Sequence, residues 1–463
     1  MMRRNTGVTG YGQARNARPR RQLHSFALIA AILVSSCSGD GSADREYRTN
    51  PAYLAPNQAG LSALLRGGTR FAAVSADESR AAEVGREILL GGGNAVDAAV
   101  AMYFAMAVTL PSAASLGASG ACIVHNARTR AGEVFAFAPT PAPGPVHGTS
   151  FTVPVGVRAV TLMHVRHGQA RWEQAVAPAE RLARLGVPVS RALARDLQAG
   201  GATLAADPEA VRYFSRRSGG LLAEGDNWAP LDLAATLGVI RQRGGADFFS
   251  GTFARFLSDQ VSRIGGNLPI ETLRSSVPIS GAPPAQDYRG YKVYVAPAPL
   301  AGARALAGWN GEPAPSTAVP TNSGGIAGLA AVDTGGGAAA CAFSMGQLFG
   351  ARIMVPGTGI LLGAPTPDAA AVSPVVVGNP QNGEFKFAGA GGGSPAAAYA
   401  TGAVARLALQ NDQPVGAALV SRRGQGGWVN AMACPEGIRS GAVSCNSGID
   451  PAGSGLALIV DSR

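Results

Sequence analysis

The sequence has little of what marks several common classes of protein. Only 15% of its 463 residues are charged and 46% are hydrophobic, which excludes a disordered chain. No Cys-x-x-Cys pair occurs, and the pair His164-x-x-His167 has no third ligand nearby, so we interpret these histidines as solvated surface residues. No histidine follows His167, which excludes a Ser-His-Asp triad within the C-terminal part. We therefore expect a globular protein with no metal and no other cofactor.

Acidic residues are absent from the first 36 positions, which hold six arginines. The net charge of the whole chain is +10, and removing those arginines leaves 10 − 6 = +4. A charge of +4 is small for a chain of this size, so no nucleic-acid partner is indicated. The six arginines are Arg3, Arg4, Arg15, Arg18, Arg20 and Arg21.

The apolar run over residues 26–34 falls short of the roughly 20 residues that a membrane-spanning helix needs. It follows the arginines and suits the core of a signal peptide over residues 1–36. It ends in Val34-Ser-Ser-Cys37, which resembles a bacterial lipobox, where the cysteine receives the lipid. We expect lipid attachment at Cys37, a tether over residues 37–67 and a cell-envelope location. The alternative is an ordinary secretory signal and a secreted protein.

Four further cysteines lie in the remainder of the chain. In an oxidising compartment, Cys434 and Cys445 could close a short C-terminal loop. Cys122 and Cys341 lie in apolar, strand-like runs, and we interpret them as inert thiols of the core.

Hydrophobic periodicity predicts helices and short strands up to about residue 300. Asn94 is expected to cap a helix with Asp97 in its first turn. Residues 303–325 are rich in alanine, proline, glycine and serine and predict an exposed linker. Helices are expected over 78–106 with a break at 91–93, over 172–197 with a break at 186–188, and over 248–265; strands are expected over 121–125, 133–137 and 291–295.

The pattern changes to short strands after the predicted linker. A hairpin is expected over residues 326–345, with its turn at 333–337. Further strands are expected over 375–377 and 385–387. The glycine-rich segment 389–393 is expected to open a helix over 394–409.

Six segments carry recognisable motifs, at residues 71–77, 92–99, 178–190, 247–251, 288–294 and 355–362. Together, and in this order, they resemble the γ-glutamyltransferase family. The resemblance implies an Ntn-hydrolase fold of class α+β, an αββα four-layer sandwich built from a precursor that cuts itself. It divides the chain into a large-subunit-like region, 68–320, and a small-subunit-like region, 321–463. It also implies transfer or hydrolysis of γ-glutamyl amides such as glutathione.

In this family the new N-terminal threonine of the smaller piece is the nucleophile. A hydroxyl is a poor nucleophile without a base. An α-amino group has a pKa near 8, so it can accept the proton of its own side chain. Self-cleavage and catalysis therefore depend on one hydroxyl residue at the start of one strand.

Counting back from Val332-Asp333 places this nucleophile at Ile326, which has no nucleophilic atom. The nearest upstream hydroxyls belong to Ser323 and Thr321. Either lies an odd number of residues away, which in a regular strand turns the side chain to the other face. Gly324 and Gly325 could absorb an irregular path. Ser323, Thr321 and the loss of the nucleophile all remain open.

Other positions of the family's site also differ. Ala138 stands where the family has an arginine, whose fork would pair with the substrate carboxylate. Ala370 and Ala371 replace paired serines, and Gly346 replaces an asparagine. The retained hydroxyls of Ser344 and Ser373 are the predicted substrate-binding groups.

Gly392 and Gly393 match the glycines that supply oxyanion-hole amides in the family. Such donors contribute roughly 3–4 kcal/mol to transition-state stabilisation. The alternative is a tight turn retained for packing.

Three hypotheses follow for the function. The resemblance implies a γ-glutamyl transferase or hydrolase with a small-molecule amide substrate. The departures at the site favour an inactive binding or structural protein of the envelope. An Ntn amidase of different specificity, using Ser323 or Thr321, is the third. Self-cleavage separates the active hypotheses from the inactive one.

Overall fold

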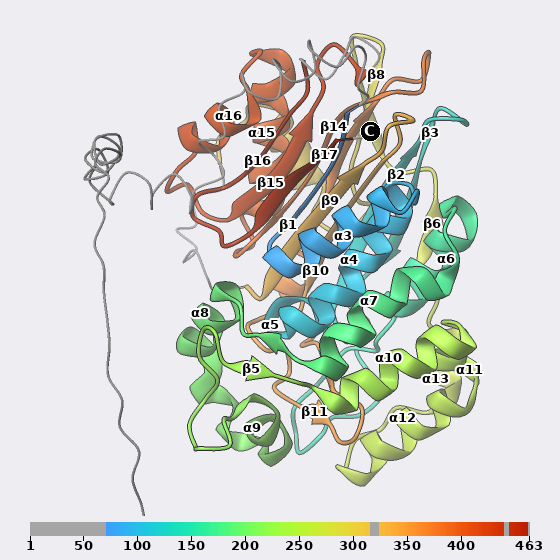
Figure 1. Cartoon of the computed structure of the whole chain (residues 1–463), viewed down its shortest axis with the longest axis vertical. Helices are drawn as coiled ribbons and strands as arrows, with labels where there is room; N and C mark the ends of the chain where they lie inside the picture. The colour runs from blue at the N-terminus through green and yellow to red at the C-terminus, as the bar shows by residue number, and fades with distance from the viewer. Residues whose placement is uncertain (1–70, 315–323, 439–443, 462–463) are drawn as a thin grey trace, which may run out of the picture. The chain divides into compact units, whose positions relative to one another are not determined.

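Two antiparallel sheets lie face to face between two helical layers in the computed structural model, which describes residues 71–314, 324–438 and 444–461 (Figure 1). The seven-stranded sheet has the order β17 (Leu456–Asp461), β1 (Phe71–Ala76), β9 (Ile326–Val332), β10 (Ala338–Ser344), β2 (Ser119–Asn126), β3 (Ala131–Phe137) and β6 (Ile279–Gly281). The six-stranded sheet has the order β16 (Asn446–Ile449), β15 (Trp428–Ala433), β14 (Phe385–Gly392), β13 (Val375–Gly378), β8 (Tyr291–Tyr294) and β7 (Ala285–Tyr288). This arrangement is the predicted αββα sandwich of class α+β.

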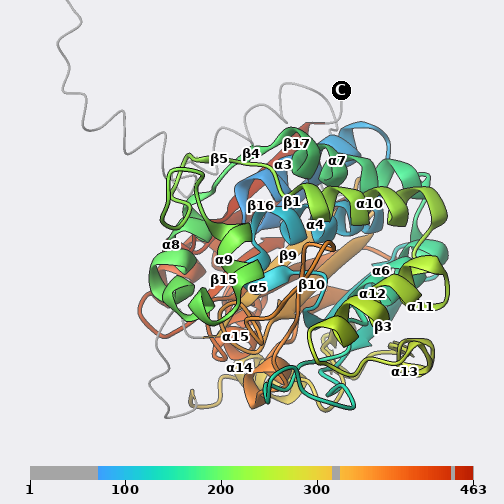
Figure 2. The same cartoon turned by 90° about the horizontal axis from the view of Figure 1, so that it is seen from below.

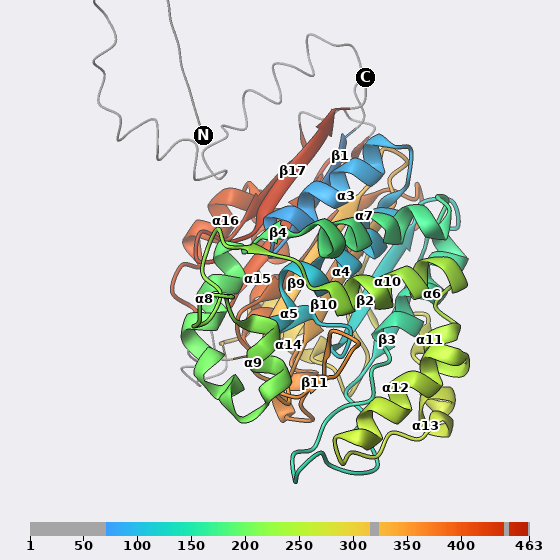
Figure 3. The ribbon, with the colours of Figure 1, turned by 60° about the horizontal axis from the view of Figure 1, so that its bottom comes forward.

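Helices cover the outer face of each sheet (Figures 1 and 3). Helices α3 (Ser79–Leu90), α4 (Ala95–Thr109), α5 (Pro111–Ala114) and α6 (Gly156–His167) pack on the seven-stranded sheet, α7 (Trp172–Leu185) packs on α4, and α10 (Leu231–Arg243) packs on α7. The same side of the molecule also holds α8 (Arg191–Gly200), α9 (Pro208–Phe214), α11 (Asp247–Ser250), α12 (Thr252–Arg263) and α13 (Ile270–Ser275). The other layer contains α14 (Gly302–Asn310), α15 (Ala397–Gln410) and α16 (Val415–Ser421). Short pieces complete the described chain: β4 (Val187–Pro188) with β5 (Asn227–Trp228), β11 (Met354–Val355) with β12 (Ile360–Leu361), and the 3₁₀ turns Gly201–Ala206 and Pro367–Ala370.

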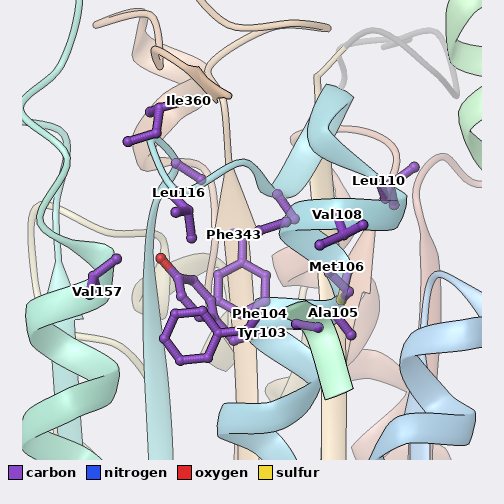
Figure 4. Packing of buried hydrophobic residues seen from close by; sticks show 14 of the residues in the cluster. Tyr103, Phe104, Ala105, Met106, Val108, Leu110, Leu116, Val157, Phe343 and Ile360 are labelled. Atoms are coloured by element: carbon purple, nitrogen blue, oxygen red, sulfur yellow. The ribbon is translucent and has the colours of Figure 1, made fainter. Parts of the chain in front are cut away.

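Strand alternation sorts the apolar residues into separate cores. In β9, Ala327 and Leu329 face the helical layer, while Ile326 and Ala330 face the six-stranded sheet. Every residue of this strand is buried, since both faces are covered. Figure 4 shows the helix-side core, where the ring of Tyr103 lies 5.4 Å from that of Phe343.

The predicted helix break at residues 91–93 is confirmed, and so is the cap that follows it. The Asn94 side chain accepts from the amides of Val96 and Asp97, and the Asp97 carboxylate accepts from the Asn94 amide at 2.9 Å. This reciprocal pair satisfies three amides at the start of α4. The helix is buried along its whole length, which explains why its sequence lacks a polar face.

The predicted exposed linker at 303–325 is wrong for its first part. Residues 302–310 form α14, with Ala305 and Trp309 buried against α15 (Figure 2). The small residues serve close helix packing: a Cβ on Gly308 would lie 2.1 Å from the carbonyl oxygen of Tyr399. Glycine and alanine that suggested a linker therefore make a helix contact.

The helix expected over 394–409 is confirmed as α15, which begins at Ala397, but most of the glycine-rich segment 389–393 belongs to β14, which runs on to Gly392. Glycines inside this strand have a packing reason. A Cβ on Gly389 would lie 2.9 Å from the ring of Phe387, and one on Gly391 would lie 2.7 Å from the carbonyl oxygen of Trp428. The strand can pack tightly only with hydrogen at these positions.

The interpretation of Cys122 and Cys341 as free thiols is wrong, since they form a disulfide. They are directly paired neighbours on β2 and β10, a pairing that their separation of 219 residues conceals in the sequence. The expected bond between Cys434 and Cys445 is confirmed.

The two subunit-like regions share both sheets. Strand β1 pairs with β9 and β17, and β8 pairs with β13, so each sheet contains strands from both regions. The signal peptide and tether over 1–67 lie outside the described residues. Within the described chain, no helix has both the length and the hydropathy required to cross a membrane.

Candidate active site

Strand β9 begins at Ile326, as predicted. By the resemblance, this is the strand at whose first residue the family carries its nucleophile. Ile326 is 2% exposed and faces the six-stranded sheet. Its carbonyl oxygen accepts from the Gly393 amide at 2.8 Å, and its direct neighbour on β10 is Ser344. The position next to the glycine pair is thus filled by a branched hydrocarbon side chain.

The space beside Ile326 is a cavity of about 10 Å³. Its walls include Ile326, Gly393, Trp428 and Arg195. One water needs about 10–15 Å³, so the cavity is at the limit for a single solvent molecule. This volume is far below the range of about 300–1,000 Å³ that is usual for ligand sites.

Trp428 and Arg195 narrow this space. Trp428 opens β15, and a Cβ on Gly393 would lie 2.3 Å from its indole ring. The guanidinium of Arg195, on α8, lies 4.5 Å from the ring centre, within the range of a cation–π contact. Arg195 is also held by Asp196 at 3.2 Å, and the Asp196 carboxylate accepts from Ser112 at 2.6 Å.

A buried carboxylate lies at the same end of the sheets. Asp77 directly follows β1, and its two oxygens accept from the Gly328 amide at 2.7 Å and from the Asn430 side chain at 2.6 Å. Gly328 belongs to β9 and Asn430 to β15, so Asp77 joins the two sheets. Burial raises the pKa of Asp77 to about 7, against the opposing effects of these hydrogen bonds and of Arg195.

The predicted oxyanion donors are near this point, and their roles stay a prediction. The Gly393 amide already donates to Ile326. Gly392 is paired with Trp428 in the register of β14 and β15, and a Cβ on it would lie 2.2 Å from an oxygen of Asp77. Close packing by itself therefore requires glycine at position 392.

The two predicted substrate-binding hydroxyls are both buried and bonded to the main chain. Ser344 donates to the Asp368 carbonyl at 3.1 Å and accepts from the Gly346 amide at 2.9 Å. Ser373 accepts from the Ala296 amide at 3.0 Å and donates to the Pro374 carbonyl at 2.9 Å. These hydroxyls thus have structural partners, and only Ser344 is a direct strand neighbour of Ile326.

Three predicted residues lie outside the described part of the chain. They are the alternative nucleophiles Thr321 and Ser323 and the lipid-bearing Cys37. Their predicted roles stay predictions.

The interpretation of the histidine pair as solvated is wrong. The side chains of His164 and His167 are only 10% and 11% exposed. His164 lies 3.3 Å from the Asp97 carboxylate, and His167 lies 2.6 Å from that of Glu133. Each imidazole has its own acidic partner, and the described residues contain no cluster of three ligand-type side chains placed to hold a metal ion.

Sequence reasoning missed Asp77, Arg195, Asn430 and Trp428 as neighbours of this position. One signal was available for Asp77, an acid immediately after an apolar strand within a segment that carries the resemblance. The other three come from α8 and β15, and only the tertiary fold brings them to β9.

Comparison with known proteins identifies the family. The model of the gamma-glutamyltranspeptidase family matches residues 81–311. The chain is 33% identical over 246 residues to the glutathione hydrolase proenzyme of Escherichia coli (strain K12). The chain belongs to the γ-glutamyltranspeptidase family. The matched region begins within α3, ends directly after α14 and does not reach β9.

The chain spans less than half the length of these curated γ-glutamyltranspeptidase relatives. The match covers 50% of this chain and 42% of the E. coli protein. For the glutathione hydrolase proenzyme of Bacillus subtilis (strain 168), identity is 30% over 241 residues, covering 48% of this chain and 41% of that protein.

A solved structure confirms the Ntn-hydrolase fold over a larger part of the chain. The cephalosporin acylase from Bacillus halodurans superposes with a TM-score of 0.70, covering 85% of this chain and 96% of that chain. Sequence identity is 18%, so the likeness establishes the fold alone.

Proposed function

We propose that this protein is a γ-glutamyltranspeptidase-family member that neither cuts itself nor transfers γ-glutamyl groups, and that it acts as a binding or structural protein of the cell envelope. One observation supports the proposal: Ile326, where counting along the family's motif places the nucleophile, is buried at the start of β9 beside a cavity of about 10 Å³. A hydrocarbon side chain supplies no lone pair for attack, and the cavity beside it is much smaller than the usual ligand site.

The electrostatics at this position support the same proposal. The family's carboxylate-binding arginine is replaced by Ala138, and the described cavity contains Arg195 stacked on Trp428. The neighbouring Gly393 amide bonds to the main chain, which removes one donor from a developing oxyanion. Under this proposal, relatives act on small-molecule γ-glutamyl amides and this protein does not.

A second candidate, an Ntn amidase that uses Ser323 or Thr321, is favoured by the backbone before β9. Gly325 has a φ of +52°, and a Cβ there would lie 2.3 Å from the carbonyl oxygen of Gln347. The chain therefore enters β9 by an irregular path, which the displaced nucleophile requires. Its substrate would be an amide other than the family's.

Self-cleavage distinguishes the two candidates. The purified protein should run as one band on a denaturing gel after long incubation, and the variants Ser323→Ala and Thr321→Ala should run identically. The gel must be reducing, because the bond between Cys122 and Cys341 would hold the two pieces together after a cut near residue 323. A small fragment beginning at Thr321 or Ser323, lost in the matching variant, would overturn the proposal and establish the amidase.

The envelope location is supported by the two disulfides, which suit an oxidising compartment. We propose that Cys37 carries the lipid that anchors the protein to a membrane. The expected result is recovery of the native protein in the membrane fraction and of Cys37→Ala in the soluble fraction. Equal partition of both would leave no role for an anchor at this cysteine.

A further inference from the structure

A second cavity, of about 530 Å³, lies within the outer helical layer. It is formed by α6, α11 and the segment that joins α13 to β6, elements that lie side by side in Figures 2 and 3. Its volume is within the range of about 300–1,000 Å³ that is usual for ligand sites. None of its lining residues belongs to the cavity beside Ile326.

Helix α6 presents two different stripes. Its core stripe includes Val157, Val160 and Met163, which are fully buried. A second stripe with helical spacing, at positions 158, 161, 162 and 165, lines the cavity. Val165 in this stripe is 74% exposed, although a helix that faced only water would carry a polar residue there.

The opposite wall is also apolar. Phe249 from α11 and Val277 and Pro278 from the connection to β6 line it. Val277 is 62% exposed, so apolar side chains stand on both sides of the opening. Apolar groups gathered at a hollow, and not scattered singly, indicate a binding surface.

Arg158 supplies a fixed positive charge in this apolar cavity. One of its guanidinium nitrogens, Nη1, donates to the carbonyl oxygens of Arg274 at 2.8 Å and Ser276 at 2.9 Å. The guanidinium also lies 5.4 Å from the centre of the Phe249 ring. Arg158 has no carboxylate partner among the described residues, and Nε and Nη2 make no hydrogen bond there.

The charged residues of the lining itself are Arg158 and Arg274. Arg274, the other charged residue of the lining, is exposed and lies 3.8 Å from Glu271, which is itself outside the lining. None of the described lining residues is acidic. The cavity therefore combines apolar walls with two guanidinium groups, and a guanidinium can pair with a carboxylate through two parallel hydrogen bonds.

We propose that this cavity binds an amphiphile with one carboxylate and an apolar chain, such as a medium-chain fatty acid. The carboxylate pairs with the guanidinium of Arg158, and the chain lies along Leu162, Val165 and Phe249. Arg158 is held in place before the ligand arrives, which lowers the entropic cost of binding. The site goes beyond the proposed function and does not depend on it, because the two cavities share no residue.

Calorimetric titration of the full-length protein with decanoate tests the site. Decanol and decyltrimethylammonium have the same chain with no charge and with the opposite charge. Decanoate should bind at least about tenfold more tightly than either, which is the effect of one charge-assisted pair. Equal binding of decanoate and decanol, or no decanoate binding at about 1 mM, would overturn the proposal.

Variants locate the binding. Val165→Asp places a negative charge at the opening without disturbing the core, and it should weaken decanoate binding at least about tenfold. The matched control is Val420→Asp, on α16, where the side chain is 49% exposed; its affinity should equal that of the native protein. Arg158→Gln should remove the preference for decanoate over decanol. Unchanged binding in Val165→Asp, or equal losses in both aspartate variants, would contradict the assignment to this cavity.

Discussion

At the scale of single residues, Ile326 and Asp77 define the candidate site. Ile326 places a buried hydrocarbon side chain at the start of β9, and Asp77 places a buried carboxyl group in the contact between the two sheets. Of these two residues, only Asp77 has a titratable side chain. The ionisation of Asp77, and with it the stability of the protein, should therefore depend on pH.

Asp77 should make the protein less stable as the pH rises. Its pKa is 3.8 as a reference value and about 7 in the folded chain, so between these values the folded state binds more protons than the unfolded state. The free energy of unfolding then falls with increasing pH, by up to about 4 kcal/mol at about 1.4 kcal/mol per pKa unit. Urea unfolding at pH 4.5 and 7.5 measures the change.

Asp77→Asn is the matched variant, since it keeps the shape and removes the ionisation. Between pH 4.5 and 7.5, the unfolding free energy of the native protein should fall relative to that of Asp77→Asn. Burial also raises the pKa values of Glu78, Asp196 and Asp450, and these contributions cancel in the difference. A difference that does not depend on pH would show that Asp77 ionises freely in the fold.

At the scale of elements, glycine decides how closely helices and strands approach. Glycine allows the backbones of α14 and α15 to lie close together, because a Cβ on Gly402 would lie 1.8 Å from the carbonyl oxygen of Ala305. Gly416 on α16 has no atom near such a Cβ. Glycine is therefore required by packing at position 402 on α15 and is not required by packing at position 416 on α16.

Gly402→Ala should destabilise the protein, because the two helix backbones must separate to admit the methyl group. We expect a loss of about 1–3 kcal/mol, the usual cost of overpacking. Gly416→Ala should be neutral or stabilising by up to about 1 kcal/mol, the helix-propensity difference. Thermal unfolding followed by circular dichroism compares them, and equal melting temperatures would show that α14 does not pack on α15 as described.

At the scale of the whole molecule, the chain is tied together across its two subunit-like regions. The bond between Cys122 and Cys341 links β2 to β10 over 219 residues, and the bond between Cys434 and Cys445 spans 11. In the chain-entropy description, a crosslink stabilises by restricting the unfolded chain, and a longer loop is restricted more.

Replacing both Cys122 and Cys341 by alanine should therefore cost more stability than replacing Cys434 and Cys445. We expect about 5 kcal/mol for the long loop and about 3 kcal/mol for the short one. Denaturant unfolding without reductant measures both double variants beside the native protein. The reverse order would mean that contacts in the folded state, and not loop length, set the value of these bonds.

The sequence by itself determined the family, the αββα class, the start of β9 at Ile326 and the cap at Asn94. These features depend on local signals, namely strand alternation, cap chemistry and ordered motifs, which neighbouring residues carry. The tertiary structure alone decided which distant residues meet: Cys122 with Cys341, His164 with Asp97, Arg195 with Trp428. It also decided that residues 302–310 form a buried helix, since a run of small residues forms an exposed linker or a close helix contact according to what lies opposite it.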